Sequence, residues 1–200
     1  KKKLKKFSYL KKKYKLPKKF FYLPNQYWEH KNHKVVIDAI KKIKNTNRFN
    51  DICVCSTGVN YDYRNPNHFN DLMKTIKQNK LDNNYKYLGV VPYTDVLSLI
   101  YYSSAVVNPS LFEGWSSTVE QAKAYNKIII LSNIKVHLEQ APERAHFFDP
   151  YNSDSLKKIF LNINYRKINK KNRIFNKNYK KTIKDNIQKY LENYYNIFNY

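Results

Sequence analysis

The sequence predicts an α/β fold in which a mainly parallel β-sheet carries helices on both faces. Short apolar runs typical of buried strands alternate along the chain with stretches whose apolar residues recur at helical spacing. Polar loops separate the successive runs. The 200 residues are 42% hydrophobic and 16% aromatic, which suffices for one well-buried core. Strands that alternate with helices imply right-handed crossovers and therefore a parallel sheet.

The first two units of strand, loop and helix follow Pro17. Phe20 to Leu23 is an apolar run suited to a buried strand, and the polar loop PNQYWEHKNH follows it. The helix after this loop is predicted from the spacing of Val35, Val36, Ala39, Ile40 and Ile43. The pattern then repeats with a strand over 51–56 and a helix over 69–80, in which Leu72, Met73 and Ile76 share one stripe.

Three further strands are predicted, over 85–88, 105–108 and 127–131. Between them, one helix is expected to begin near Pro92 and another to span 118–125. Ligands of parallel sheets bind at the carboxyl ends of the strands. We therefore expect the functional residues in the loops that follow Leu23, Ser56, Asn108 and Leu131.

The two ends of the chain differ from this middle part. Residues 1–19, KKKLKKFSYLKKKYKLPKK, show no clear period and are interpreted as a basic linker or a solvated lead-in. A single domain is expected over 20–165. Residues 166–200 are interpreted as a basic tail with an amphipathic helix after Thr182.

The formal net charge of +23 lies mainly in these flanks. Residues 1–20 contribute +11 and residues 161–200 contribute +8, which leaves only +4 for the 140 residues between them. Lys outnumbers Arg by 33 to 5, a bias that indicates compositional drift rather than a surface built to bind phosphates or bases. We therefore expect no specific nucleic-acid partner, while peripheral contact of the flanks with an anionic membrane stays open as an alternative.

The location of the protein is predicted to be cytoplasmic. No apolar run approaches the roughly 20 residues that span a bilayer, and no signal peptide is visible. Cys53 and Cys55 lie two residues apart in one predicted strand, where a disulfide between them is poorly placed. They are interpreted as reduced core residues.

The segment Asn108 to Ala122 carries the strongest sign of chemistry. It is predicted to run from a strand through a tight loop into a helix, whose first N–H groups and positive dipole end suit a phosphate. Gly114 would let the backbone approach a ligand, and the Glu113 carboxylate could accept hydrogen bonds from sugar hydroxyls. These properties alone leave two readings open, an anion or sugar site and an ordinary turn between strand and helix.

The same segment resembles the Glu-x7-Glu motif of retaining glycosyltransferases of family 4, here in the form EGWSSTVEQA. Three longer segments resemble that family in order and spacing: FYLPNQYWEHKNHKVVIDAI, YLGVVPYTDVLSLIYYSSAVVNPSLFEGWS and IIILSNIKVHLEQAPERAHFFDP. The resemblance covers about residues 20–160. It implies a Rossmann-like unit, the C-terminal half of a GT-B fold, which binds a nucleotide diphosphate sugar. A hexose would then pass to an unknown acceptor with retention, and the acceptor would bind an N-terminal half that this fragment lacks.

The resemblance also implies roles for individual residues. Glu113 matches the first motif glutamate, which lies against the donor sugar, and Lys31 matches the basic residue that neutralises the diphosphate. These two are the expected catalytic residues, although Lys31 could also be a solvated loop lysine. Gly114, Trp115, Ser116 and Ser117 are expected to line the donor site, together with Thr57 and Gly58 in the loop after the second strand. The family's other common basic position is occupied by Gln26.

The second motif glutamate is replaced by Gln121, which we assign to the donor ribose. An amide forms a weaker bond there than a carboxylate, so a non-catalytic nucleotide-sugar-binding relic is one alternative function. A basic interaction module for lipid or nucleic acid is the other. The neighbouring Glu120 has capping-box spacing to Ser117.

Four further residues are interpreted as having no part in the chemistry. We interpret His30 and His33 as loop residues near the donor, and His137 and Glu139 as structural residues of the loop after the fifth strand. No carboxylate pair lies at metal spacing to the histidines. The resemblance also implies a fold that normally works without a bound metal, so neither a metal nor a cofactor is expected.

Overall fold

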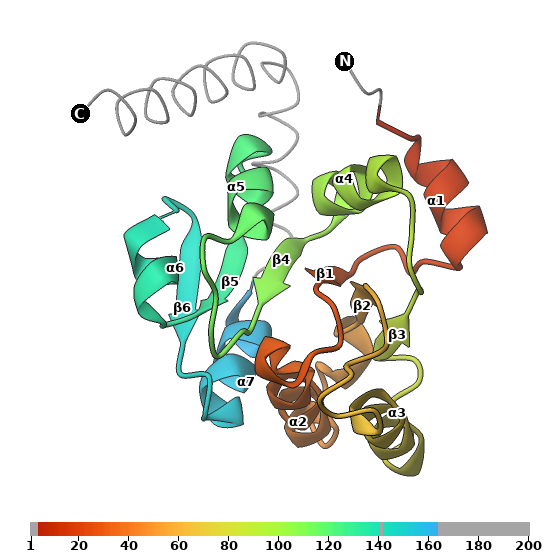
Figure 1. Ribbon diagram of the computed structural model, residues 1–200. Coiled ribbons are helices and arrows are strands. Elements are labelled where there is room, and N and C mark those ends of the chain that lie inside the picture. The colour runs from red at the N-terminus through yellow and green to blue at the C-terminus, as the bar shows by residue number, and fades with distance from the viewer. Residues whose placement is uncertain (1–3, 141, 164–200) are drawn as a thin grey trace.

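Strands and helices alternate along the computed structural model, which describes residues 4–140 and 142–163 (Figure 1). The described residues form one 6-stranded sheet in the order β3-β2-β1-β4-β5-β6, and each neighbouring pair is parallel. The strands are β1 (Phe21–Pro24), β2 (Val54–Thr57), β3 (Tyr85–Tyr87), β4 (Ala105–Asn108), β5 (Ile129–Ser132) and β6 (Ala145–Phe148). The predicted parallel α/β fold is confirmed.

Helices cover both faces of this sheet (Figure 1). They are α1 (Phe7–Tyr14), α2 (His33–Ile43), α3 (His68–Gln78), α4 (Tyr93–Tyr102), α5 (Ser117–Ala124), α6 (Lys135–Gln140) and α7 (Ser153–Asn162), with short 3-10 helices η1 (Glu29–Lys31) and η2 (Phe49–Asp51). Helices α2, α3 and α7 bury their apolar residues on one face, against strand residues such as Phe21 and Val54. Helices α1, α4 and α5 cover the opposite face, against Tyr22 and Val106.

The strand order reverses its direction between β1 and β4. Chain connections from β1 run outward through β2 to β3, and those from β4 run outward the other way through β5 to β6. The loops after β1 and β4 leave the same edge of the sheet side by side. The helices that follow them, α2 and α5, cover opposite faces of the sheet. In open parallel sheets such a switch point is where ligands bind.

The five strands and four helices predicted from the sequence are present, with ends shifted by up to three residues. Helices α6 and α7 and strand β6 were missed. Strand β6 lies at the edge of the sheet, where only Phe148 of its four residues is buried, so its sequence lacks the apolar run that marks the inner strands. Helix α6 contains His137 and Glu139, so the prediction of a loop at these positions was wrong.

Helix α1 corrects the interpretation of residues 1–19. Leu10 is fully buried, Leu16 is 3% exposed, and the Asp95 carboxylate of α4 accepts hydrogen bonds from Lys13 Nζ (2.8 Å) and Tyr14 Oη (2.6 Å). This segment therefore packs on α4 and is not a solvated lead-in. The helix was missed because lysines fill the positions between its few apolar residues. The stripe predicted after Thr182 lies outside the described residues.

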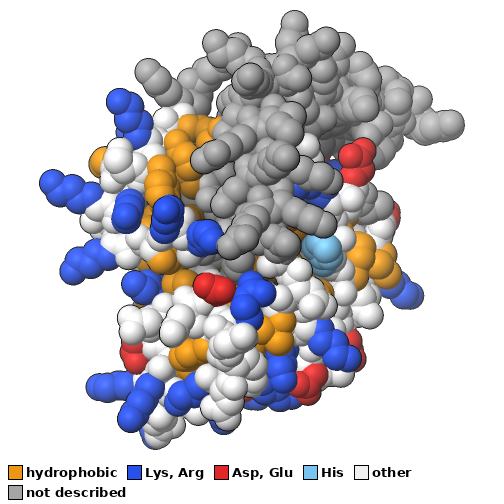
Figure 2. Space-filling model, turned by 180° about the vertical axis from the view of Figure 1, so that it is seen from behind, with side chains coloured by type: hydrophobic (Ala, Val, Ile, Leu, Met, Phe, Trp, Pro, Cys, Tyr) orange, Lys and Arg blue, Asp and Glu red, His pale blue; other side chains and the backbone are white. Residues whose placement is uncertain are grey.

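Lys and Arg side chains project from much of the surface that Figure 2 shows, and Asp and Glu side chains are fewer there. Cys53 and Cys55 are buried free cysteines, as predicted. Within residues 4–140 and 142–163, none of the helices combines the length and hydropathy needed to cross a membrane.

Candidate functional site

The loop after β1 places Lys31 at the switch point. It turns through η1, and Asn32 adopts a left-handed conformation (φ 53°) before α2 begins at His33. The carbonyl oxygen of His30 accepts a hydrogen bond from Leu111 N (2.8 Å) in the loop after β4, so the two loops are joined through their backbones. Lys31 is only 9% exposed, which excludes the alternative of a solvated loop lysine.

Lys31 and Glu113 form a salt bridge across these loops. Lys31 Nζ donates to Glu113 Oε2 at 2.8 Å, and both side chains are 11% exposed. The other carboxylate oxygen, Oε1, accepts from Ser110 Oγ (2.7 Å) and Asn108 Nδ2 (3.3 Å). Both oxygens of Glu113 are therefore held, and the two residues predicted to be catalytic lie in direct contact.

The hydrogen bonds around Glu113 continue to the end of β1. Asn25 Nδ2 donates to Asn108 Oδ1 (2.9 Å), and Asn108 Nδ2 donates to Ser116 Oγ (2.9 Å) at the start of α5. Asn25, Asn108, Ser110 and Ser116 are all buried. These bonds fix the orientation of the carboxylate before any ligand arrives. Of these residues only Ser116 was predicted from the sequence, although Asn25 and Asn108 stand where their strands end at the ligand edge.

Burial and hydrogen bonding act in opposite directions on Glu113. Burial opposes ionisation, but the hydrogen bonds from Lys31 and Ser110 and the Lys31 charge outweigh it, so the pKa of Glu113 lies below its usual range. The carboxylate is therefore the stable form at neutral pH. Such a buried pair needs both partners, since removal of one leaves the other charge uncompensated.

This lowered pKa predicts an acid dependence of stability. A carboxyl whose pKa is lower in the folded state adds stability that is fully present above its unfolded pKa, about 4.3, and is lost as the pH falls through the folded value. We expect the free energy of unfolding of Glu113→Gln to fall less steeply below about pH 4.3, by at most about 1.4 kcal/mol per pH unit. Urea denaturation at several pH values measures this. The exposed Glu139→Gln is the control, and an equal change of slope in both variants would contradict the prediction.

The start of α5 differs from the predicted capping box. Ser116, not Ser117, is the N-cap residue, and its side chain makes no capping bond. Glu120 instead accepts hydrogen bonds from Lys123 Nζ (3.2 Å) and Gln140 Nε2 (2.9 Å). The capping-box prediction was therefore wrong, because α6 offers Glu120 a partner that the local sequence does not reveal. The first N–H groups of α5 consequently have no side-chain cap from Ser116.

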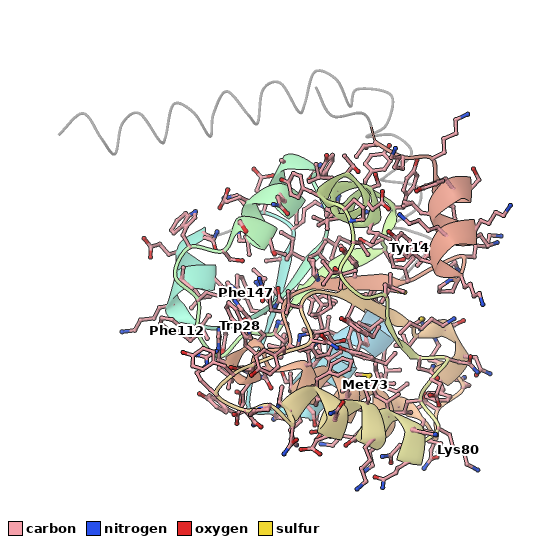
Figure 3. All side chains as sticks on the ribbon, turned by 45° about the vertical axis from the view of Figure 1, so that its right-hand side comes forward. Tyr14, Trp28, Met73, Lys80, Phe112 and Phe147 are labelled. Carbon is pink, nitrogen blue, oxygen red and sulfur yellow. The ribbon has the colours of Figure 1, made fainter. Side chains whose placement is uncertain are left out.

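The tip of this loop is open. A Cβ atom added at Gly114 would meet nothing within 4 Å, and Phe112 and Trp115 are 69% and 56% exposed. The Phe112 ring lies 6.4 Å from that of His30, which lies 5.7 Å from that of Trp28. Figure 3 shows Trp28 and Phe112 near each other at this end of the molecule. Exposed aromatic rings thus lie on both sides of Glu113 in the loop after β4.

The other predicted donor residues take no part in the hydrogen bonds of this pair. Gln26 is exposed, and Ser117 is exposed at the first position of α5. The Thr57 hydroxyl is bonded to Tyr22 Oη (2.7 Å) within the fold. Gly58 adopts φ 146° directly beside Asn25. Gln121 Nε2 donates to Tyr93 Oη (3.2 Å), so its amide faces the first residue of α4.

Of the two histidines predicted in the first loop, His33 lies in the core of the protein. His33 is fully buried at the start of α2, where burial lowers its pKa to about 3. Its ring stacks on Tyr27 and is bonded to Tyr85 Oη (2.7 Å) and the Gln26 carbonyl (3.0 Å). It is therefore a core residue rather than a loop residue. No group of three or more His, Cys, Asp or Glu in the described part of the chain could hold a metal ion.

In a comparison with protein families, a family model described as "Glycosyl transferases group 1" matches residues 5–182. The chain belongs to this family. A comparison with curated proteins gave no match.

Three solved structures illustrate what this group 1 glycosyltransferase chain is similar to. A glycosyltransferase from Rickettsia africae has a TM-score of 0.68 at 21% identity, with 96% of this chain and 52% of that chain covered. HepE from Anabaena in complex with UDP has a TM-score of 0.66 at 16% identity, with 88% and 44% covered. Sucrose-phosphate synthase from Thermosynechococcus elongatus has a TM-score of 0.63 at 14% identity, with 98% and 50% covered. The chain thus spans about half the length of these structures, and the likeness confirms the Rossmann-like fold of a GT-B half.

Proposed function

We propose that this chain is the donor-binding half of a retaining family 4 glycosyltransferase, which takes a hexose from a nucleotide diphosphate sugar. The observation that carries the proposal is the Lys31–Glu113 pair at the switch point of the sheet. It places a cation and a carboxylate, both nearly buried, beside the open loop at Gly114. These are the two groups that a diphosphate and a sugar require.

In this proposal each member of the pair meets a different part of the donor. Lys31 turns from Glu113 to the diphosphate and stabilises the charge that grows on it as it leaves. The uncapped N–H groups at the start of α5 offer further donors to the same phosphates. Glu113, still held by Ser110 and Asn108, accepts hydrogen bonds from the sugar hydroxyls. No step calls for a metal ion.

The similar structures support a nucleotide diphosphate as the ligand. HepE is described in complex with UDP, with UDP and glucose, and with UDP-glucose. Uracil is therefore the first base to test in this chain. The acceptor is proposed to bind the N-terminal half of the complete enzyme, so this chain alone is expected to bind donor without transferring it.

A direct test is calorimetry of the 200-residue chain with UDP, GDP and ADP and with their glucose derivatives. The proposal expects one base to bind, with the glucose derivative binding more tightly than the free diphosphate. Glu113→Gln should remove this sugar-dependent gain while retaining affinity for the free diphosphate. No binding of any of the six compounds would reject the donor-binding role.

Gln121→Glu is expected to strengthen binding of the free diphosphate and the nucleotide sugar alike, by about 1 kcal/mol, because a carboxylate accepts ribose hydroxyls in charge-assisted bonds. The neighbouring Tyr93 hydroxyl can donate to the new carboxylate as well as it accepts from the amide. Calorimetry on the variant measures the gain. Glu120→Gln is the matched control, since Glu120 faces Lys123 and Gln140, and a gain from that variant instead would show that the motif register is off by one.

The presence of Gln121 where the family motif has a glutamate also favours a second candidate function. In this second function the chain is a nucleotide-sugar-binding relic without transfer activity. The two functions differ in the behaviour of the complete enzyme, since only the first predicts turnover of the bound donor. Restored turnover in Gln121→Glu would identify the amide as the cause.

A further inference from the structure

His137 lies in the interior of the molecule, next to the end of β5. It belongs to α6 and is fully buried. Its Nδ1 atom lies 3.0 Å from the carbonyl oxygen and 3.1 Å from Oγ of Ser132, the last residue of β5. Its Nε2 atom is buried with no hydrogen-bond partner within the described residues. What the ring contributes to this part of the protein therefore passes through Nδ1.

The partners of Nδ1 determine which nitrogen carries the proton. The Ser132 carbonyl can only accept, and the one proton of the Ser132 hydroxyl is donated to the Ser110 carbonyl (2.5 Å). Nδ1 must therefore be the donor, with Nε2 unprotonated. Burial lowers the pKa of His137, which keeps this neutral form.

The bonds continue from Ser110 to the site. The Ser110 hydroxyl lies 2.7 Å from Glu113 Oε1 and 2.8 Å from Asn108 Oδ1. Asn108 Oδ1 already accepts from Asn25, and the carboxylate is the stronger acceptor, so the Ser110 proton goes to Glu113. Three donated bonds thus lead from His137 to Ser132, from Ser132 to Ser110, and from Ser110 to Glu113.

We propose that His137 is a positioning residue for Glu113, which it orients through Ser132 and Ser110. It fixes the end of β5, the Ser132 hydroxyl fixes the Ser110 carbonyl, and the Ser110 side chain is thereby aimed at the carboxylate. The contribution of these three hydrogen bonds to sugar binding rests on the proposed function of Glu113. The orientation of Glu113 itself does not.

The test compares four variants of the 200-residue chain. His137→Leu removes the ring donor, Ser132→Ala removes the next bond, and His137→Asn keeps a donor near the position of Nδ1. Lys127→Met is the matched control, because Lys127 is also buried and donates to two backbone carbonyls, those of Tyr101 and Ser103, at the opposite end of β5. Each variant is measured for thermal stability, for the Glu113 carboxyl pKa by NMR titration, and for the ratio of UDP-glucose to UDP affinity.

His137→Leu and Ser132→Ala are expected to raise the Glu113 pKa and to lower the affinity ratio about threefold to tenfold, the worth of one hydrogen bond. His137→Asn should retain values near those of the unmodified chain, and Lys127→Met should lose stability without changing either quantity. The proposal is overturned if His137→Leu and Ser132→Ala behave like Lys127→Met. If the Glu113 pKa responds while the unmodified chain binds neither nucleotide, the positioning role stands and the donor-binding role fails. If His137→Leu does not fold, Ser132→Ala decides alone.

Discussion

Lys31→Ala is expected to weaken binding of the nucleoside diphosphate about 10- to 150-fold and to leave binding of the free nucleoside unchanged. The bond removed is a charge-assisted contact with phosphate, worth about 1.5–3 kcal/mol. The nucleoside lacks the group that Lys31 would meet. Calorimetry with both ligands measures the two losses, and equal losses would indicate that the loop after β1 has moved instead.

The same variant should also be less stable, because Glu113 stays nearly buried without its counter-charge. Loss of one partner of a buried ion pair costs about 3–5 kcal/mol. Combining Lys31→Ala with Glu113→Gln removes the unpaired charge and should recover most of that stability, as measured by urea denaturation. It should not recover diphosphate affinity. This double variant therefore separates the structural effect of Lys31 from its effect on the ligand.

Gly58→Ala is expected to destabilise the fold by about 2–5 kcal/mol. A Cβ atom there would lie 2.4 Å from the Asn25 carbonyl oxygen and 2.9 Å from Gln26 Cα, and the φ of 146° is rarely adopted by residues with side chains. The clash is with backbone, which cannot rotate away. Since Asn25 donates to Asn108, the loop that supports Glu113 should shift as well.

Gly114→Ala is the matched comparison, because its added Cβ meets nothing within 4 Å. Its free energy of unfolding should stay within about 0.5 kcal/mol of the unmodified chain. Its donor affinity should nevertheless fall, since the methyl group enters the space proposed for the sugar. Thermal denaturation and calorimetry of both glycine variants provide the comparison, and a stable Gly58→Ala would contradict the close approach at Asn25.

The sequence predicted the inner part of this fold better than its edges. Strands β4 and β5 are continuous apolar runs because both of their faces are buried, and such runs are visible without any structure. Strand β6 has one neighbour and a mostly exposed sequence, so nothing local marks it. Helix α1 could not be predicted from its local sequence either, because Lys13 is paired with Asp95, which lies 82 residues away.

The candidate site was predictable as a set of residues but not as an arrangement. Lys31 and Glu113 each matched a family position, yet their direct contact depends on β1 and β4 being neighbours in the sheet. The support from Ser110 and His137 depends on the docking of β5 and α6. The capping box predicted for Glu120 was wrong for the same reason, since Gln140 of another helix donates to this carboxylate.

The adjacency of β1 and β4 also governs when the site can form during folding. Lys31 and Glu113 are 82 residues apart, and the whole unit of β2 and β3 with its helices lies between them. Contacts of such long sequence separation form slowly, because the intervening chain must be ordered before the pairing is rewarded. Trp28 and Trp115, the two tryptophans of the chain, lie in the loops that meet there. Their fluorescence is therefore expected to report the pairing of β1 with β4, whereas circular dichroism reports the formation of the helices.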